Sequence, residues 1–354
     1  MTYYFLLIFL WGLVGFIIQT NNNLMKNRGK IHLFFGSVSL ILIMGLRDET
    51  VGTDIISYKN EFENADYYLN NLLRPTELGY SFFNNLINTI GFNFQMYLLI
   101  ISIIIIGSIS LLYYRYSKNV LMSFYLHFTI GLFAMSMSGI RQILAVSITI
   151  IAFIFLMKNK KLLFFLFTCL AYTFHNSAIA FLITIFFKNI KITKKSGFII
   201  FGIASLMFFM KGWLTIIVQY LTPDKYLKYL EISFDTNINP LVILVNMAIP
   251  LACLLLWPKS SEGKESNILS IIFILSCINF LISFLSVEIK YLSRISFYFM
   301  VYNTVLIPNV INNIKSKEIK TIALIFCIFL PLVQFIMVTP GSSLGIDNYK
   351  FFWE

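Results

Sequence analysis

The chain has 354 residues, of which 58% are hydrophobic and only 12% are charged, and its mean hydropathy is +0.80. This composition leaves too little polar surface for a soluble globule of this size, so a bilayer must be the solvent. The net charge of +11 does not indicate nucleic-acid binding, because the Lys and Arg residues stand in short clusters between apolar runs.

Apolar runs that can cross a bilayer recur along the whole chain. A spanning helix needs roughly 20 apolar residues, or somewhat fewer where the flanking residues snorkel. The run at 161–187 is too long for one helix, and His175 and its neighbours interrupt it, so we interpret it as two short helices that turn at His175. The sequence thus predicts an all-α membrane bundle of about 11–12 transmembrane segments, at about 3–20, 31–46, 94–114, 120–137, 140–157, 161–187 (the pair), 196–213, 240–257, 267–287, 295–314 and 321–338.

The basic residues between these runs predict the topology, because cytoplasmic loops carry an excess of Lys and Arg. If the loop around Arg28 is inside, 17 of the 27 Lys and Arg fall on inside loops and 13 of the 16 Asp and Glu fall outside. The lysine cluster at 188–195 lies on the inside only if residues 161–187 cross the membrane and return to the same side. We therefore expect both termini outside and a single transmembrane domain over residues 1–354.

Two outside loops are longer than a connection requires. They span about residues 47–93 and 211–239, and loops of this length in a compact protein are usually functional or disordered. Each carries aromatic side chains among its polar residues, such as Tyr67 in the first and Trp213 in the second. We expect both loops to form amphipathic pieces at the level of the lipid headgroups.

Three arginines are predicted at outer helix ends, although basic residues are usually enriched on the cytoplasmic side. Arg47 follows the second span, Arg141 opens the fifth and Arg294 opens the eleventh. Each one alone can be a snorkelling side chain that ends a helix. Three at one depth favour a phosphate or pyrophosphate ligand, whose oxygens guanidinium groups bind with two hydrogen bonds at once.

His175 is predicted at the same depth, in the turn between the two short helices. A histidine can accept a proton near neutral pH, and Asn176 and Ser177 beside it supply further hydrogen bonds. The alternative is that these three residues only form a turn and begin a helix. No His, Asp or Glu cluster has the spacing of metal ligands, and each of the four cysteines lies singly in an apolar run, so no metal site is predicted.

Several segments together resemble a known family. The run from Gly45 to Tyr58, GLRDETVGTDIISY, with Phe62 four residues later, resembles the "LR…VGTD…Y…F" signature of the EpsG family, which comprises Wzy-like polymerases of bacterial capsule, exopolysaccharide and O-antigen. Ile55 departs from the Thr that this family often has after the Asp, without changing a charge. The other matching elements follow in the family's order and extend the resemblance over nearly the whole chain: Glu77 to Tyr80 ("E-x-G-Y"), Ser138 to Gln142 ("R-Q"), His175 to Ala178 ("H-x-S-A") and Arg294 with Tyr298 and Phe299 ("R…YF").

The resemblance implies glycosyl transfer at the outer face of the bacterial plasma membrane. A growing glycan would leave undecaprenyl pyrophosphate and join the next lipid-linked repeat unit, without a nucleotide sugar or a cofactor. His175 would be the base, with Asp54 as second candidate. Arg141 and Arg294 would hold the pyrophosphate, and Arg47 would position either the same group or the outer loop. The expected substrate-binding residues are Arg47, Tyr58, Glu77, Tyr80, Gln142, Ser177 and Tyr298.

Other functions stay open from the residues alone. A flippase or transporter of lipid-linked repeat units also needs cations for a pyrophosphate, although we would expect them along a cavity at the midplane. A membrane O-acyltransferase would also use a buried histidine, and a ligase would end the chain on another acceptor. The expected partners are the lipid-linked oligosaccharide and the bilayer, with flippase and chain-length regulator proteins as candidate protein partners and no nucleic acid.

Overall fold

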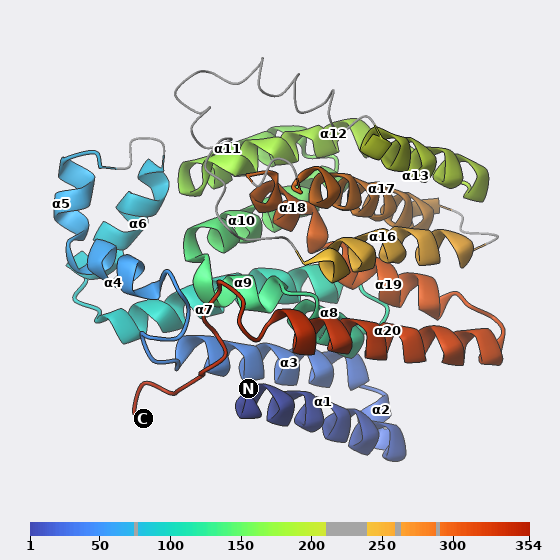
Figure 1. Cartoon of the computed structure of the whole chain (residues 1–354), viewed down its shortest axis with the longest axis horizontal. Coiled ribbons are helices and arrows are strands. Elements are labelled where there is room, and N and C mark those ends of the chain that lie inside the picture. Colours follow the sequence, from blue (N-terminus) through green and yellow to red (C-terminus); the bar gives the residue numbers. More distant parts are fainter. Residues whose placement is uncertain (74–76, 210–238, 259–262, 288–290) are drawn as a thin grey trace. The chain divides into compact units, whose positions relative to one another are not determined.

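A computed structural model describes residues 1–73, 77–209, 239–258, 263–287 and 291–354 (Figure 1). The regular elements among these residues are all helices, without a strand, which confirms the predicted all-α class. Among them six helices are long and apolar enough to cross a membrane, or seven if one bent pair forms a single span. The chain is a multi-pass membrane protein by this helix content. The second expected outer loop, 211–239, lies outside the described residues except for its last residue.

The chain divides into two compact units. The first comprises Met1–Leu182 and Phe335–Glu354, and the second comprises Ile183–Gln334. The long spans of the first unit are α1 (Thr2–Thr20), α3 (Arg28–Gly45), α7 (Phe94–Tyr116) and α10 (Ile140–Met157). Those of the second are α17 (Gly263–Leu285) and most of α20 (Lys317–Val338).

The expected span at 120–137 is sharply bent. It consists of α8 (Val120–Thr129) and α9 (Leu132–Ser138), whose axes differ by 59°. The break falls at Gly131, whose φ of +97° lies in the left-handed region that residues with a Cβ rarely adopt. A second break at Gly139 separates α9 from α10, so Arg141 lies in the first turn of a new helix.

The interpretation of 161–187 as two short helices that reverse the chain is confirmed. α11 (Lys161–Phe174) ends before His175, and a 3₁₀ helix, η1 (Asn176–Ile183), follows and leads into α12 (Thr184–Phe187). The ring centroids of Phe164 and Phe181 lie 6.1 Å apart. A straight helix would separate these two residues by about 25 Å, so the chain must turn back between them.

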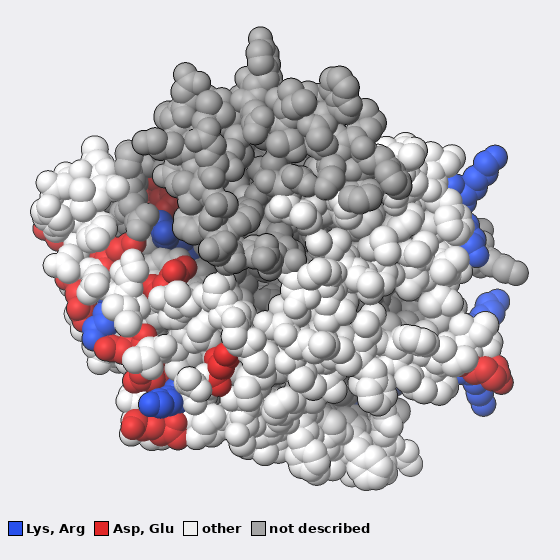
Figure 2. Space-filling model, in the orientation of Figure 1, with Lys and Arg blue, Asp and Glu red and all other residues white. Residues whose placement is uncertain are grey.

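The helices of the first unit place its basic clusters at one end. Ser37 of α3 and Ser110 of α7 share a hydrogen bond of 2.7 Å, and Gln95 donates to the Gly45 carbonyl at 2.6 Å, so α3 and α7 are antiparallel. The rings of Tyr116 and Phe153, near the C-terminal ends of α7 and α10, lie 5.7 Å apart. The residues around Arg28, Arg115 and Lys158 therefore share one end, as the topology predicts. In Figure 2 most of the acidic side chains in view gather over the region of α4–α6 and the C-terminus.

The first outer loop of this unit folds into α4 (Ile55–Glu63), α5 (Ala65–Asn70) and α6 (Leu78–Thr89). α6 is amphipathic, with Ser81 and Asn84 buried and Phe82 and Leu86 exposed. The prediction of amphipathic pieces in this loop is thus confirmed. Its short helices are positioned against the spans, because α4 and α6 contact each other and α6 also packs against α11.

The second unit is built around α17, against which α13 (Lys194–Phe209) and α16 (Pro240–Leu255) pack. The expected span at 295–314 is divided into α18 (Leu292–Met300) and α19 (Asn303–Asn312). Buried amide and hydroxyl groups tie α16 to α17: Asn279 donates to Asn246 at 3.1 Å, and Asn246 donates to Ser283 at 3.0 Å. In a membrane the hydrophobic effect does not drive helices together, because lipid tails are as apolar as the helices. Hydrogen bonds of this kind therefore help to fix how such helices pack.

Candidate functional site

Arg141 is the centre of the best-defined polar cluster in the first unit. Its guanidinium forms an ion pair with Glu77, and its Cζ lies 5.5 Å from the ring centroid of Tyr58 and 5.7 Å from that of Tyr80. The Arg141 side chain is only 20% exposed, and its buried Nε has no hydrogen-bond partner. A carboxylate and two aromatic faces therefore orient a cation at the start of a membrane helix while part of it stays open.

A chain of phenol groups supports this cluster from α6 and α7. The hydroxyls of Tyr80 and Tyr97 lie 3.0 Å apart, and the Tyr97 hydroxyl donates to Asn84 Oδ1 at 2.6 Å. The rings of Tyr58 and Tyr80 meet edge to face at 6.1 Å. Burial raises the pKa of both Tyr58 and Tyr80, so both phenols are neutral near pH 7 and act as hydrogen-bonding and packing groups.

Three residues of this network were missed by the sequence analysis: Glu61, Asn84 and Tyr97. Glu61 is buried on the same face of α4 as Tyr58, and its charge contributes to the raised pKa of Tyr58. The helical spacing of Ile55, Tyr58 and Phe62 could have identified that face, and Glu61 falls on it. Acidic residues of an outer loop are usually solvated, so composition alone gave no reason to select it.

His175 lies at the turn between α11 and η1. Its Nδ1 lies 2.7 Å from Ser177 Oγ, and the Ser177 backbone N–H donates to the same nitrogen at 3.3 Å. The backbone N–H can donate only to an unprotonated Nδ1, so this contact favours the neutral tautomer with its proton on Nε2, in which the Ser177 hydroxyl also donates to Nδ1. Ser177 thus supplies two hydrogen bonds that orient the His175 ring.

The His175 turn is next to α6. A Cβ added at Gly79 would lie 2.1 Å from Thr173 Oγ1, so α6 passes α11 at a distance that only glycine allows. The rings of Phe83 and Phe174 pack 6.0 Å apart. Glu77 is the N-cap of α6 and Tyr80 lies in its first turn, so α6 links the histidine turn to the Arg141 cluster.

Arg47 has a very different environment. It is fully buried, and its Nη1 donates to the Met44 carbonyl at 2.8 Å and contacts Met137 Sδ at 3.2 Å, while Nε and Nη2 have no hydrogen-bond partner. Burial lowers the Arg47 pKa to about 10, although Tyr4 and Tyr349 oppose this shift. Nothing in this arrangement exposes Arg47 to a ligand.

The C-terminal segment 339–354 covers Arg47 and the VGTD loop. Arg47 forms an antiparallel bridge with Phe351. Asp48 N–H donates to the Lys350 carbonyl at 2.9 Å, and Gly52 N–H donates to the Gly345 carbonyl at 2.9 Å. These bonds connect residues about 300 positions apart in the sequence, so the loop and the tail form one structural element.

Gly52 is required by the shape of this loop. Its φ is +107°, and a Cβ there would lie 2.4 Å from the backbone carbonyl of Met137. The loop therefore passes directly against the end of α9, two residues before α10 begins. Asp54 follows as the N-cap of α4, with an exposed side chain that makes no capping hydrogen bond.

The structure thus brings four of the predicted site residues together: Tyr58, Glu77, Tyr80 and Arg141. Gln142, the residue after Arg141, is buried. Arg294 and Tyr298 belong to the second unit, where Arg294 is exposed in the first turn of α18 and Tyr298 is fully buried. Among the described residues, no group of three or more His, Cys, Asp or Glu could hold a metal ion.

Comparison with known proteins identifies the family. No curated protein and no solved structure matches the chain. The model of the EpsG family matches residues 30–351, which include most of the first unit, all of the second and every predicted site residue. The chain therefore belongs to the EpsG family, whose members are membrane proteins linked to polysaccharide biosynthesis.

Proposed function

We propose that this protein is a Wzy-type polysaccharide polymerase of the bacterial plasma membrane. In the proposed reaction, the bond between the sugar C1 and the pyrophosphate oxygen breaks, and the same C1 bonds to a hydroxyl oxygen of the next lipid-linked repeat unit. Undecaprenyl pyrophosphate leaves with the electron pair of the broken bond, and the acceptor hydroxyl gives its proton to a base.

The observation that carries this proposal is the arrangement around Arg141. The developing negative charge on the leaving pyrophosphate needs a cation that is already oriented, because an oriented charge stabilises a transition state without reorganisation. Glu77 and the faces of Tyr58 and Tyr80 orient Arg141 at the first turn of a membrane helix. The free N–H groups at a helix start also favour an anion there.

His175 is the base in this proposal. Its contact with Ser177 orients the ring, and its turn packs beside the helix that links it to Arg141. Asp54 remains the second candidate, because it is exposed next to the loop that packs on α9. Arg294 is assigned to the pyrophosphate by its motif alone.

A flippase of lipid-linked repeat units is the main competing function. A transporter site is expected near the middle of the membrane on helices that expose it alternately to both sides. In the first unit, the oriented cation instead lies at the helix end opposite the basic clusters around Arg28, Arg115 and Lys158. This one-sided position favours a reaction at one face.

The test is the profile of carrier-linked glycans in cells that lack the gene. A polymerase mutant accumulates a single repeat unit on the carrier at the outer face of the membrane, and wild-type protein restores the polymer. His175→Gln, which keeps hydrogen bonding but is not a base, should leave the single repeat. Repeats that accumulate only on the cytoplasmic face would instead identify a flippase, and full-length polymer in the deletion strain would reject both.

A further inference from the structure

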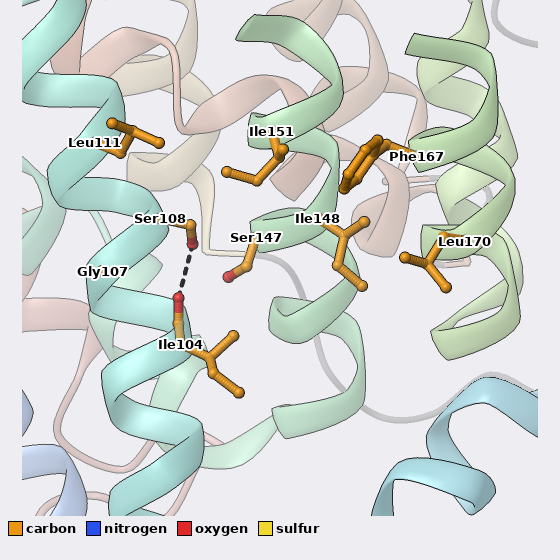
Figure 3. Close-up of a pocket in the computed structure, with 9 residues that line it drawn as sticks. All are labelled: Ile104, Gly107, Ser108, Leu111, Ser147, Ile148, Ile151, Phe167 and Leu170. Atoms are coloured by element: carbon orange, nitrogen blue, oxygen red, sulfur yellow. Dashed lines mark hydrogen bonds between the residues drawn. The ribbon is translucent and has the colours of Figure 1, made fainter. Parts of the chain in front are cut away.

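An apolar groove lies in the first unit between α7, α10 and α11, with α10 as its floor (Figure 3). Its volume is about 320 Å³, which is within the range of small-molecule sites. Its walls are mostly aliphatic or aromatic. The residues that define it best are Gly107 and Ser108 on α7, Ser147 and Ile148 on α10, and Phe167 and Leu170 on α11.

The chemistry of the lining suits a hydrocarbon chain. The two serine hydroxyls donate back to their own helices, from Ser108 Oγ to the Ile104 carbonyl at 3.0 Å and from Ser147 Oγ to the Ile143 carbonyl at 2.9 Å. A Cβ on Gly107 would meet nothing within 4 Å, so the α7 wall is open at that point. The groove therefore offers contact surface and no unsatisfied donor for a polar ligand.

The groove is in register with Arg141. Ile148 follows Arg141 by seven residues, which is about two helical turns or 10 Å, so both residues lie on one face of α10. On α11, Leu170 lies about one turn before Thr173, where α6 passes at Gly79. A chain that extends along α10 from a headgroup at Arg141 would thus reach the groove after passing α6.

α6 has the polarity of a helix that faces hydrocarbon. Leu78, Phe82 and Leu86 recur every four residues and are 41%, 60% and 48% exposed, whereas Ser81 and Asn84 are buried. A helix at a water-facing surface shows the reverse pattern. Its apolar side therefore suits lipid tails, and its polar side faces the phenol network next to Arg141.

We propose that this groove binds the isoprenoid chain of the lipid-linked substrate, with its pyrophosphate at Arg141. This inference rests on the proposed function and adds a site for the carrier lipid. A single chain fits a groove with one floor and two walls, and the polar end of the lipid then meets the oriented cation two turns away. Binding of one lipid by both parts would explain why the apolar groove and Arg141 lie on the same face of α10.

The experiment uses the purified full-length protein in detergent and a polyprenyl phosphate with a photoreactive diazirine in its chain. Gly107→Leu should fill the open part of the groove and reduce labelling about tenfold, which corresponds to about 1.4 kcal/mol of binding free energy. Gly12→Leu on α1 is the matched control, because a Cβ there also meets nothing within 4 Å. It should label like wild type.

Mapping of the labelled peptides in the wild-type protein gives a second readout that needs no variant. Labels on α7, α10 and α11, displaced by excess unlabelled polyprenyl phosphate but not by the same excess of phosphatidylglycerol, support the inference. Labels elsewhere, equal displacement by both lipids, or equal labelling of the two variants overturn it. These outcomes are independent of the glycan profile, so a protein that polymerises glycan but labels elsewhere loses the groove assignment and keeps the proposed function.

Discussion

Arg47 and Arg141 look alike in the sequence but have opposite environments in the first unit. Both stand at a predicted outer helix end, between an aliphatic residue and a polar or charged one. Arg47 is sealed under the C-terminal segment with two buried nitrogens unpaired, while Arg141 is paired with Glu77, flanked by two tyrosine rings and partly open. An arginine at the membrane surface is therefore not by itself evidence of a phosphate site, because burial decides whether its charge can meet a ligand.

The two arginines also differ in how firmly their surroundings enclose the guanidinium group. Arg141 is held by groups that leave an edge exposed, so it can change partners when a ligand arrives. Arg47 is enclosed between the Met44 carbonyl and Met137, next to the loop that passes the end of α9. We infer that Arg47 positions the outer loop and that Arg141 contacts the substrate.

The largest effect is expected at Arg141. Arg141→Lys keeps the charge but loses the planar two-point contact, and it should lower the polymerisation rate by about 10²–10³, as for other single contacts that strengthen in a transition state. The measurement is polymer formed in complemented cells at matched protein level. Near-normal polymer from Arg141→Lys would show that Arg141 has only a structural role at the start of α10.

A smaller effect, on stability, is expected at Gly52. Gly52→Ala places a Cβ in the left-handed region and against the Met137 carbonyl, while Gly91→Ala, at φ +92°, creates the same backbone strain with nothing within 4 Å. The backbone term costs roughly 1–2 kcal/mol in both variants. Thermal unfolding in detergent should therefore show the lower midpoint for Gly52→Ala, and equal midpoints would show that the loop is not held against α9.

The smallest effect is expected at Arg47. Arg47→Met removes a buried cation with unpaired nitrogens, and such replacements are often neutral or stabilising. We expect an unfolding midpoint at or above that of wild type and a loss of polymer of at most about tenfold, well below the effect at Arg141. Arg141→Met, measured in parallel, is the control. A loss of activity as large as that of Arg141→Met would place Arg47 at the substrate.

The sequence by itself determined the membrane class, the helical fold and the family. These conclusions need only local information, since composition selects the solvent and the lengths of apolar runs select the helices. The reversal at His175 also followed from the sequence, because the charge of the flanking loops required it. The motif residues Glu77, Tyr80 and Arg141, which the sequence analysis selected, lie together in the structure.

Only the tertiary structure decided which neighbours each charged residue meets. The pairing of Arg141 with Glu77 joins residues 64 positions apart, and the cover over Arg47 comes from the other end of the chain. The buried position of Glu61 and the groove between α7, α10 and α11 likewise depend on how helices pack. Burial and ion pairing are properties of such long-range contacts, and a single sequence carries no local pattern that specifies them.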